Sequence, residues 1–207
     1  MTAELTSAER DALLDIARSA IAGRLGIDAP QARPDVPIEG TQLDEPGACF
    51  VTLQREGRLL GCIGSMEPRR SLAADVAANA VAAAFADPRL PPITAADCPA
   101  MAIEISVLGP LEPLGVRSAR ELSEVLVPGR DGVLVSSPDH RGTFLPSVWV
   151  SLPRRDQFLR QLWRKAGLRP FEWPPDLAAY RYRTEQFGGA FAAADAVSPP
   201  NPQPPPP

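Results

Sequence analysis

The sequence contains few of the residues that most often build metal and redox centres. Its one histidine is His140, and its three cysteines, Cys49, Cys62 and Cys98, include no CxxC pair. An odd number of widely spaced cysteines predicts free thiols rather than a disulfide framework or a cysteine zinc site. A single histidine excludes a His-rich metal centre and leaves little material for a Cys/His catalytic pair. The chain itself therefore implies neither a metal nor an organic cofactor.

The sequence also lacks long apolar runs and a basic stripe. No window approaches the roughly 18 uninterrupted apolar residues of a membrane span, and the N-terminus has no basic region followed by an apolar stretch. We therefore expect a cytoplasmic protein without membrane contact. The net charge of −4 and the pI near 5.1, with no sustained run of Lys and Arg, argue against nucleic acid as a partner.

Proline, in contrast, is abundant, with 25 residues in a chain of 207. Many of them gather at the C-terminus, which ends in four prolines that can neither donate backbone hydrogen bonds nor bury much apolar surface. We expect residues 192–207 to form a disordered tail, in preference to a polyproline ligand for an aromatic groove. The remaining chain is long enough for one substantial core, with or without a small appended subdomain.

Two segments carry clear helix signals. Thr6 and Glu9 fit a capping box at the start of the first helix, which we expect to end near Gly26. Residues 72–86 are rich in alanine and predict a central helix that neighbouring elements can approach closely. Its apolar stripe contains one polar side chain, Asn79, which must find hydrogen-bond partners if the stripe is packed.

Residues 48–54 and 59–64 are two short β-favouring runs, joined by a tight reversal that Gly57 permits. They predict a β-hairpin. A two-residue turn places Val51 opposite Cys62, so that the thiol shares a face with apolar neighbours.

Residues 101–108 alternate cleanly, which predicts a strand with Glu104 and Ser106 on one face. A second hairpin is expected around His140, and a late strand over residues 178–183 is expected to return to the sheet. Together these elements predict an α+β fold with a mainly antiparallel sheet and flanking helices, with room for a smaller appended subdomain.

Five blocks of sequence carry a family resemblance. They are Cys49-Phe50-Val51-Thr52-Leu53, Gly61-Cys62-Ile63-Gly64, Asp75 to Asp87-Pro88-Arg89, Ile103-Glu104-Ile105-Ser106-Val107-Leu108, and Arg141-Gly142-Thr143-Phe144-Leu145-Pro146 with Val148-Trp149. In this order and spacing, over residues 5–190, they resemble the AMMECR domain family, called AmmeMemoRadiSam system protein A in prokaryotes. The family typically has Arg in place of Leu60 and an aromatic residue in place of Leu90. If that arginine binds an anion in relatives, this protein has lost the contact or supplies it elsewhere.

The resemblance implies an α+β fold with a mainly antiparallel sheet, flanking helices and a smaller subdomain. The prokaryotic system name also implies an association with a Memo-like protein and a radical S-adenosylmethionine protein, as parts of a shared modification pathway.

The first functional hypothesis is a thiol-dependent enzyme, of a reaction left open, with Cys62 as nucleophile. A thiol between Gly61 and Gly64 is accessible to a substrate, and its flanking amides could stabilise an anion. Without a motif histidine, Glu104 is the candidate base or orienting group. The candidate binding residues are Asn79 as hydrogen-bond donor, Arg89 and Arg141 as electrostatic partners, and Thr143 as a hydroxyl for a phosphate or carboxylate. We expect Cys62, Asn79, Arg89, Glu104 and Thr143 to converge in one cleft.

Each candidate also has a structural interpretation. Cys62 can pack beside Val51 and Leu60 while its glycines let a neighbouring element approach. Glu104 can form an ion pair with a nearby arginine, Asn79 can tie its helix to a loop, and the arginines can be fold-stabilising clamps. The alternative function is then a non-catalytic protein- or peptide-binding scaffold that acts with the Memo-like and radical S-adenosylmethionine proteins.

Overall fold

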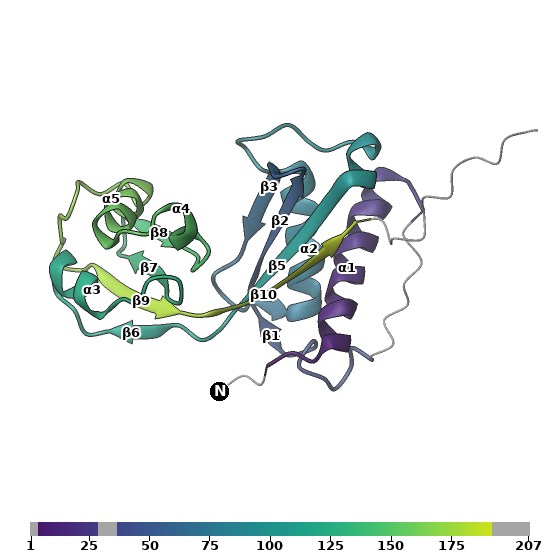
Figure 1. The fold of residues 1–207 in the computed structure, drawn as a ribbon. Coiled ribbons are helices and arrows are strands. Elements are labelled where there is room, and N and C mark those ends of the chain that lie inside the picture. The colour runs from purple at the N-terminus through teal and green to yellow at the C-terminus, as the bar shows by residue number, and fades with distance from the viewer. Residues whose placement is uncertain (1–3, 29–36, 192–207) are drawn as a thin grey trace, which may run out of the picture. The chain divides into compact units, whose positions relative to one another are not determined.

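The computed structural model describes residues 4–28 and 37–191, and the expected tail over residues 192–207 lies outside them. The chain divides into two compact units (Figure 1). Among the described residues, the large unit contains residues 5–28, 37–107 and 186–191, and the small unit contains Leu108–Glu185 together with Glu4. Each unit has its own hydrophobic core. No helix within the described ranges is long and apolar enough to cross a membrane.

The large unit is built from two long helices and a four-stranded sheet. Its elements are α1 (Ser7–Leu25), β1 (Pro46–Gly47), β2 (Cys49–Arg55), β3 (Arg58–Gly64), β4 (Arg70–Ser71), α2 (Leu72–Phe85), the 3-10 helix η1 (Ala95–Ala100), β5 (Met101–Leu108) and β10 (Thr184–Ala190). The main sheet has the order β10-β5-β2-β3, in which β2 is antiparallel to both β3 and β5. The capping box of Thr6 and Glu9 is present, and α1 ends at Gly26 in the left-handed conformation, as predicted.

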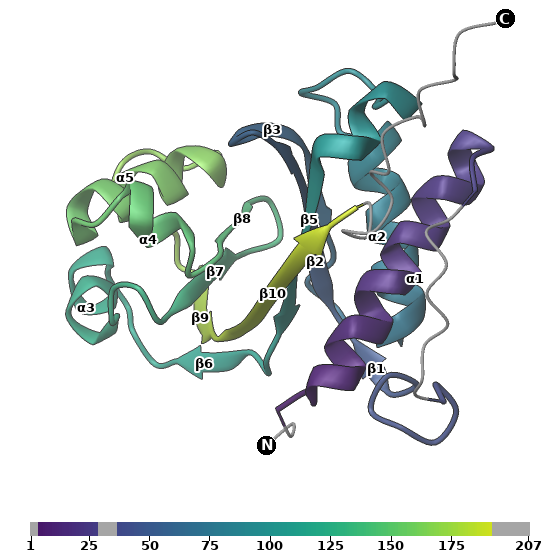
Figure 2. The ribbon, with the colours of Figure 1, turned by 45° about the vertical axis from the view of Figure 1, so that its right-hand side comes forward.

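Both helices cover the same face of this sheet (Figures 1 and 2). The α2 backbone approaches β3 so closely that a Cβ at Gly61 would overlap the carbonyl oxygen of Ala83. At the other edge α1 covers β10, where a Cβ at Gly189 would lie 3.4 Å from Leu14. The glycines in β3 and β10 therefore set how near the helix layer can come to the sheet.

The small unit contains a second antiparallel sheet and three helices. Its elements are β6 (Glu112–Leu114), α3 (Ala119–Val125), β7 (Gly132–Ser136), β8 (Arg141–Phe144), α4 (Val148–Ser151), α5 (Arg155–Lys165) and β9 (Ala178–Tyr182). The sheet order is β6-β9-β7-β8. In the core, the Trp149 ring stacks on Phe158 with centroids 3.7 Å apart, and its Nε1 donates to the Asp131 carbonyl at 2.8 Å.

The structure confirms the α+β class predicted from the sequence, with helices packed on antiparallel sheets. The late strand, β9, pairs with β7 in the sheet of the small unit. The strand that returns to the main sheet is the next one, β10, which the sequence did not reveal. The two units also differ in composition, because all three cysteines lie in the large unit and all three tryptophans in the small one. Thiol chemistry and tryptophan fluorescence therefore report on different units.

Gly61→Ala should destabilise the large unit by about 3 kcal/mol, because the new Cβ forces α2 away from β3. Gly23→Ala is the matched control, since no atom lies within 4 Å of a Cβ at this position of α1, and it should stabilise by about 1 kcal/mol. The measurement is the denaturant dependence of Cys49 alkylation, with tryptophan fluorescence as a readout of the small unit. Equal stability of the two variants would show that α2 does not contact β3 at Gly61.

Candidate functional site

The β2–β3 hairpin closes with a two-residue turn, as the sequence predicts. Glu56 and Gly57 have φ angles of 52° and 78°, and Arg55 pairs with Arg58. The register then shifts at a β-bulge, which leaves one extra residue, Leu60, in β3. From this point the hairpin differs from the predicted pairing by one residue.

The bulge places Cys62 opposite Thr52 and not opposite Val51. The prediction that the thiol shares a face with Val51 and its apolar neighbours is therefore wrong. The reason lies beneath α2, where only glycine fits against the Ala83 carbonyl. Gly61 occupies that position, and Cys62 points to the opposite face of the sheet because side chains alternate along a strand.

On that opposite face, Cys62 begins a row of side chains across the sheet. The Thr52 hydroxyl donates a hydrogen bond to the Cys62 sulfur at 3.2 Å, and Glu104 of β5 lies directly opposite Thr52. We call Cys62, Thr52 and Glu104 the cross-strand row. Because neighbouring strands are about 4.8 Å apart, the Cα atoms of Cys62 and Glu104 are about 10 Å apart. A molecule lying across the row can therefore reach the thiol and the carboxylate together.

The three side chains of the cross-strand row are all partly exposed. Within residues 4–28 and 37–191, the Glu104 side chain makes no hydrogen bond and no ion pair, so the expected pairing with an arginine is not found there. Gly188 of β10 lies beside Glu104 and adds no side chain that would cover it. The carboxylate thus remains available to a ligand.

Cys62 is also the accessible cysteine. Cys49 and Cys98 are buried, and burial raises the pKa of both thiols. Buried cysteines of this kind behave as small apolar side chains and react slowly. Reagents that modify thiols should therefore reach Cys62 first.

The backbone of Cys62 is held at the outer edge of β3 by the turn that follows α2. Its N–H donates to Asp87 Oδ2 at 2.9 Å, and its carbonyl accepts from Arg89 Nη2 at 3.1 Å. Arg89 also binds the Asp87 carboxylate through Nε at 2.8 Å and Nη2 at 2.6 Å. We call Asp87 and Arg89 the edge clamp. Arg89 was predicted as a binding residue, whereas Asp87 was named only as part of a family block, because the amide that it binds lies far away in the sequence.

The two charges of the edge clamp stabilise each other. The hydrogen bonds from Arg89 hold the pKa of Asp87 well below its ordinary value despite burial, and the Cys62 amide adds to this effect. The Asp87 carboxylate in turn raises the pKa of Arg89, and the nearby Cys62 thiol contributes in the same direction. The side chain of Asp87 is only 2% exposed and that of Arg89 is 60% exposed. The guanidinium therefore presents positive charge to the solvent beside the thiol.

The backbone N–H groups of Gly61, Cys62 and Ile63 all donate hydrogen bonds within the fold. Asp87 takes the Cys62 N–H. Successive residues of a strand direct their N–H groups to opposite edges, so those of Gly61 and Ile63 point towards β2. The suggestion that amides flanking the thiol stabilise an anion is therefore wrong.

Asn79 lies on the other side of the sheet from Cys62. Its side-chain amide donates to the Cys49 carbonyl at 3.1 Å and to Asp75 at 2.9 Å. Asp75 also accepts from the Cys49 N–H at 2.9 Å and pairs with Arg70 at 2.9 Å. This buried cluster ties α2 to the start of β2, so Asn79 does not join the expected cleft.

The other predicted binding residues lie outside the cross-strand row. Gly64 lies beneath the Phe50 ring, which a Cβ at this position would overlap. Thr143 donates to a β7 carbonyl at 2.9 Å and shares a 2.7 Å hydrogen bond with Tyr182. Arg141 and Thr143 both belong to β8 of the small unit, and ligand binding by them stays a prediction.

The described ranges contain no group of three or more His, Cys, Asp or Glu side chains arranged to hold a metal ion. His140 lies in the β7–β8 turn, where its Nδ1 is 3.2 Å from the Ala166 carbonyl oxygen. The candidate site of the large unit is thus the cross-strand row together with the edge clamp. Its chemical groups are a thiol, a hydroxyl, a carboxylate and a guanidinium.

Comparison with known proteins gives a consistent set of relatives. The AMMECR1 family model matches residues 14–187. A protein of Methanothermobacter thermautotrophicus is 34% identical over 195 residues, covering 89% of this chain and 96% of the relative. One of Thermofilum pendens is 35% identical over 208 residues, covering 92% and 95%. The crystal structure of an uncharacterized protein from Pyrococcus horikoshii superposes with a TM-score of 0.74 at 32% identity, covering 85% of this chain and 89% of that one.

Asp87→Asn should destabilise the large unit by about 3 kcal/mol at neutral pH, because Arg89 loses its buried partner. The pKa of Asp87 is lowered in the fold, so its stabilisation is present above about pH 4 and is lost as the pH falls towards the folded pKa. The difference between wild type and variant should therefore shrink below about pH 4. Urea unfolding followed by far-UV circular dichroism across pH measures it.

The matched control is Asp11→Asn, which removes the same charge from an exposed position of α1 and should leave stability unchanged. A difference between wild type and Asp87→Asn that is as large at pH 3 as at pH 7 would contradict the role assigned to the carboxylate.

Proposed function

The chain belongs to the AMMECR1 family, and we propose that it is a thiol-dependent enzyme in which Cys62 is the nucleophile and Glu104 transfers a proton. The observation that carries the proposal is the unpartnered state of Glu104 among the described residues, on the same face as the accessible thiol. A partly exposed carboxylate without a partner in the fold keeps its acceptor oxygens available to a ligand.

The side chains around the thiol support a role as nucleophile. The Thr52 hydroxyl donates a hydrogen bond to the sulfur and so orients it within the cross-strand row. Arg89 adds a positive charge that is fixed by Asp87. In the proposed reaction the Cys62 thiol gives its proton to water and its sulfur adds to the electrophilic carbon of a conjugated double bond, whose π bond breaks as the C–S bond forms. The displaced electron pair moves to the far end of the same molecule, where Glu104, about 10 Å away across the row, donates a proton. Release reverses the step: the Glu104 carboxylate takes that proton back as the C–S bond breaks.

The non-catalytic scaffold is the second candidate, and the edge clamp favours it. With the amides of Gly61, Cys62 and Ile63 all bonded within the fold, none of these three is free to bind the oxyanion that acyl transfer would form. In that case the face with the cross-strand row binds a protein or peptide without turnover. The partners proposed for it are a Memo-like protein and a radical S-adenosylmethionine protein, which the prokaryotic family name suggests.

Glu104→Gln should trap a covalent adduct on Cys62, because breaking the C–S bond requires a carboxylate to take the proton back, which the Gln amide cannot do. Wild type and variant are incubated with a small-molecule cell extract and then with iodoacetamide, and Cys62 is examined by peptide mass mapping. The expected result is a mass adduct that protects Cys62 from alkylation in Glu104→Gln and is scarce in wild type. Glu56→Gln, on the exposed hairpin turn, is the control and should behave as wild type.

The two candidate functions separate in the same experiment. Equal alkylation of Cys62 in all three proteins, without an adduct, would contradict the proposal that the protein is a thiol-dependent enzyme. If Cys62→Ser then binds a purified Memo-like protein as tightly as wild type does, the scaffold is the better account.

A further inference from the structure

The small unit contains a surface groove of about 470 Å³ between α3 and α5. The buried side chains of Ala119 and Leu159 lie at its base, and the half-exposed ring of Phe171 forms part of its wall. Its rim carries three charged residues, Arg120 and Glu124 of α3 and Asp156 of α5. The volume is in the range of sites that hold a few side chains of a ligand. This groove is separate from the residues proposed for thiol chemistry.

Phe171 takes its position in the wall of the groove with a strained backbone conformation. Its φ angle is 61°, a left-handed conformation that is unusual for a bulky residue. It follows Pro170 in a turn closed by the Glu172 N–H and the Arg169 carbonyl at 3.1 Å, and the third position of such a turn normally takes Gly or Asn. Strain of this kind persists where neighbours hold the backbone, and it is concentrated at binding sites.

The residues that follow Phe171 are firmly anchored. Trp163 Nε1 donates to the Glu172 carbonyl at 2.6 Å, and the Trp163 and Trp173 rings pack 5.8 Å apart. Phe171 itself remains 41% exposed, with the Arg160 guanidinium 5.5 Å from its ring centroid. Phe171 of the loop and Arg160 of α5 therefore present an aromatic ring and a cation together beside the groove.

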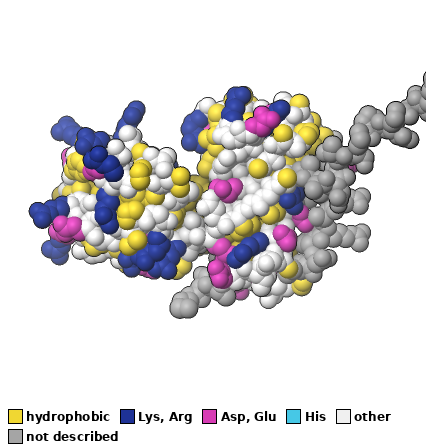
Figure 3. Space-filling model, viewed as in Figure 1, with side chains coloured by type: hydrophobic (Ala, Val, Ile, Leu, Met, Phe, Trp, Pro, Cys, Tyr) yellow, Lys and Arg dark blue, Asp and Glu magenta, His cyan; other side chains and the backbone are white. Residues whose placement is uncertain are grey.

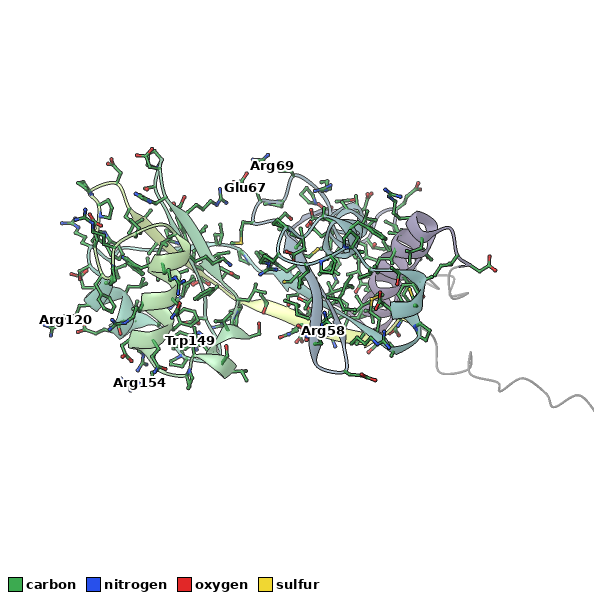
Figure 4. All side chains as sticks on the ribbon, turned by 90° about the horizontal axis from the view of Figure 1, so that it is seen from above. Arg58, Glu67, Arg69, Arg120, Trp149 and Arg154 are labelled. Carbon is green, nitrogen blue, oxygen red and sulfur yellow. The ribbon has the colours of Figure 1, made fainter. Side chains whose placement is uncertain are left out.

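The charges around the groove favour an acidic ligand. Glu124 is paired with Arg120 at 3.1 Å and Asp156 with Arg154 at 2.9 Å, so both rim carboxylates are already neutralised. Arg160 has no carboxylate partner among the described residues. Residues 108–185 carry twelve Lys and Arg against nine Asp and Glu, although the whole chain has 21 against 25. Figure 3 shows the basic side chains gathered over this unit, and Figure 4 shows Arg120 and Arg154 extending outward from it.

We propose that the α3–α5 groove is a docking site for an acidic peptide segment of a partner protein, anchored by one aromatic or aliphatic side chain. The anchor packs on Leu159 and against the Phe171 ring, and the acidic residues that flank it pair with Arg160, while Arg120 and Arg154 continue to neutralise the rim carboxylates. The aromatic ring supplies affinity, and the Arg160 cation supplies selectivity for acidic segments.

Fluorescence anisotropy with labelled peptides tests the proposal. The probe has Leu-Phe flanked by two Glu on each side, and its matched forms carry Lys for Glu or Ser-Ser for Leu-Phe. The acidic Leu-Phe peptide should bind at least about tenfold more tightly than either matched form, and less tightly as salt is added. Phe171→Asn should weaken binding by about tenfold or more, while the unfolding temperature of the small unit, read from tryptophan fluorescence, stays equal or rises as strain is relieved.

Arg160→Gln should weaken binding of the acidic peptide and reduce its salt dependence. Arg58→Gln removes the same charge from the exposed β2–β3 turn and should change neither. Three results would overturn the proposal: equal binding of the Lys peptide, preferential binding of a labelled oligonucleotide or of a peptide with this chain's residues 192–207, or a lower unfolding temperature for Phe171→Asn with unchanged binding.

Discussion

The large unit depends on one close contact, between the backbone of α2 at Ala83 and the backbone of β3 at Gly61. A residue with a side chain cannot occupy the helix-facing position at this point of β3. The bulge at Leu60 brings Gly61 to that position, and the same adjustment turns Cys62 to the face that neither α1 nor α2 covers. The position of the thiol is thus a consequence of helix–sheet packing, and its pairing with Thr52 and Glu104 follows from the strand register.

The surroundings of Cys62 divide into groups that maintain the fold and groups that are available for chemistry. The edge clamp satisfies the outward-facing N–H and C=O of Cys62, which would otherwise be open to another strand at this point of β3. In doing so it fixes the thiol and places a guanidinium beside it, but it also consumes the amide that an oxyanion would need. Among the described residues, Glu104 is the one member of the cross-strand row whose side chain has no hydrogen bond or ion pair. The proposal of thiol chemistry with remote proton transfer follows from this division.

Local signals in the sequence were sufficient for most individual elements. Thr6, Glu9 and Gly26 define α1 because caps depend on residues within one turn of each other, and the alternation of residues 101–108 predicts β5 and the shared face of Glu104 and Ser106. The family resemblance directed attention to the β2–β3 hairpin and the turn after α2, which the structure brings together at Cys62 and Arg89.

The errors arose where distant segments meet. Leu59 and Leu60 are both apolar, so the pattern of β3 does not reveal the bulge, and the contact that requires it involves a helix far along the chain. Asp87 acts through the Cys62 amide, which no local motif predicts. Asn79 is a polar residue of the kind that binding sites use, but its side-chain amide is hydrogen-bonded within a buried network. β9 and β10 are adjacent in sequence and belong to different sheets, so no linker marks the division into two units.

The register of the hairpin is the central claim, and disulfide formation tests it directly. In a background with Cys49→Ala and Cys98→Ala, Thr52→Cys and Val51→Cys are each oxidised with copper phenanthroline and examined by mass spectrometry. Thr52 and Cys62 form a non-hydrogen-bonded pair, whose Cα atoms lie about 4.5 Å apart, within the range of disulfides. We predict a disulfide between Cys62 and the cysteine at position 52, and none with position 51. A disulfide to position 51 in place of 52 would contradict the bulge and return Cys62 to the apolar face beneath α2.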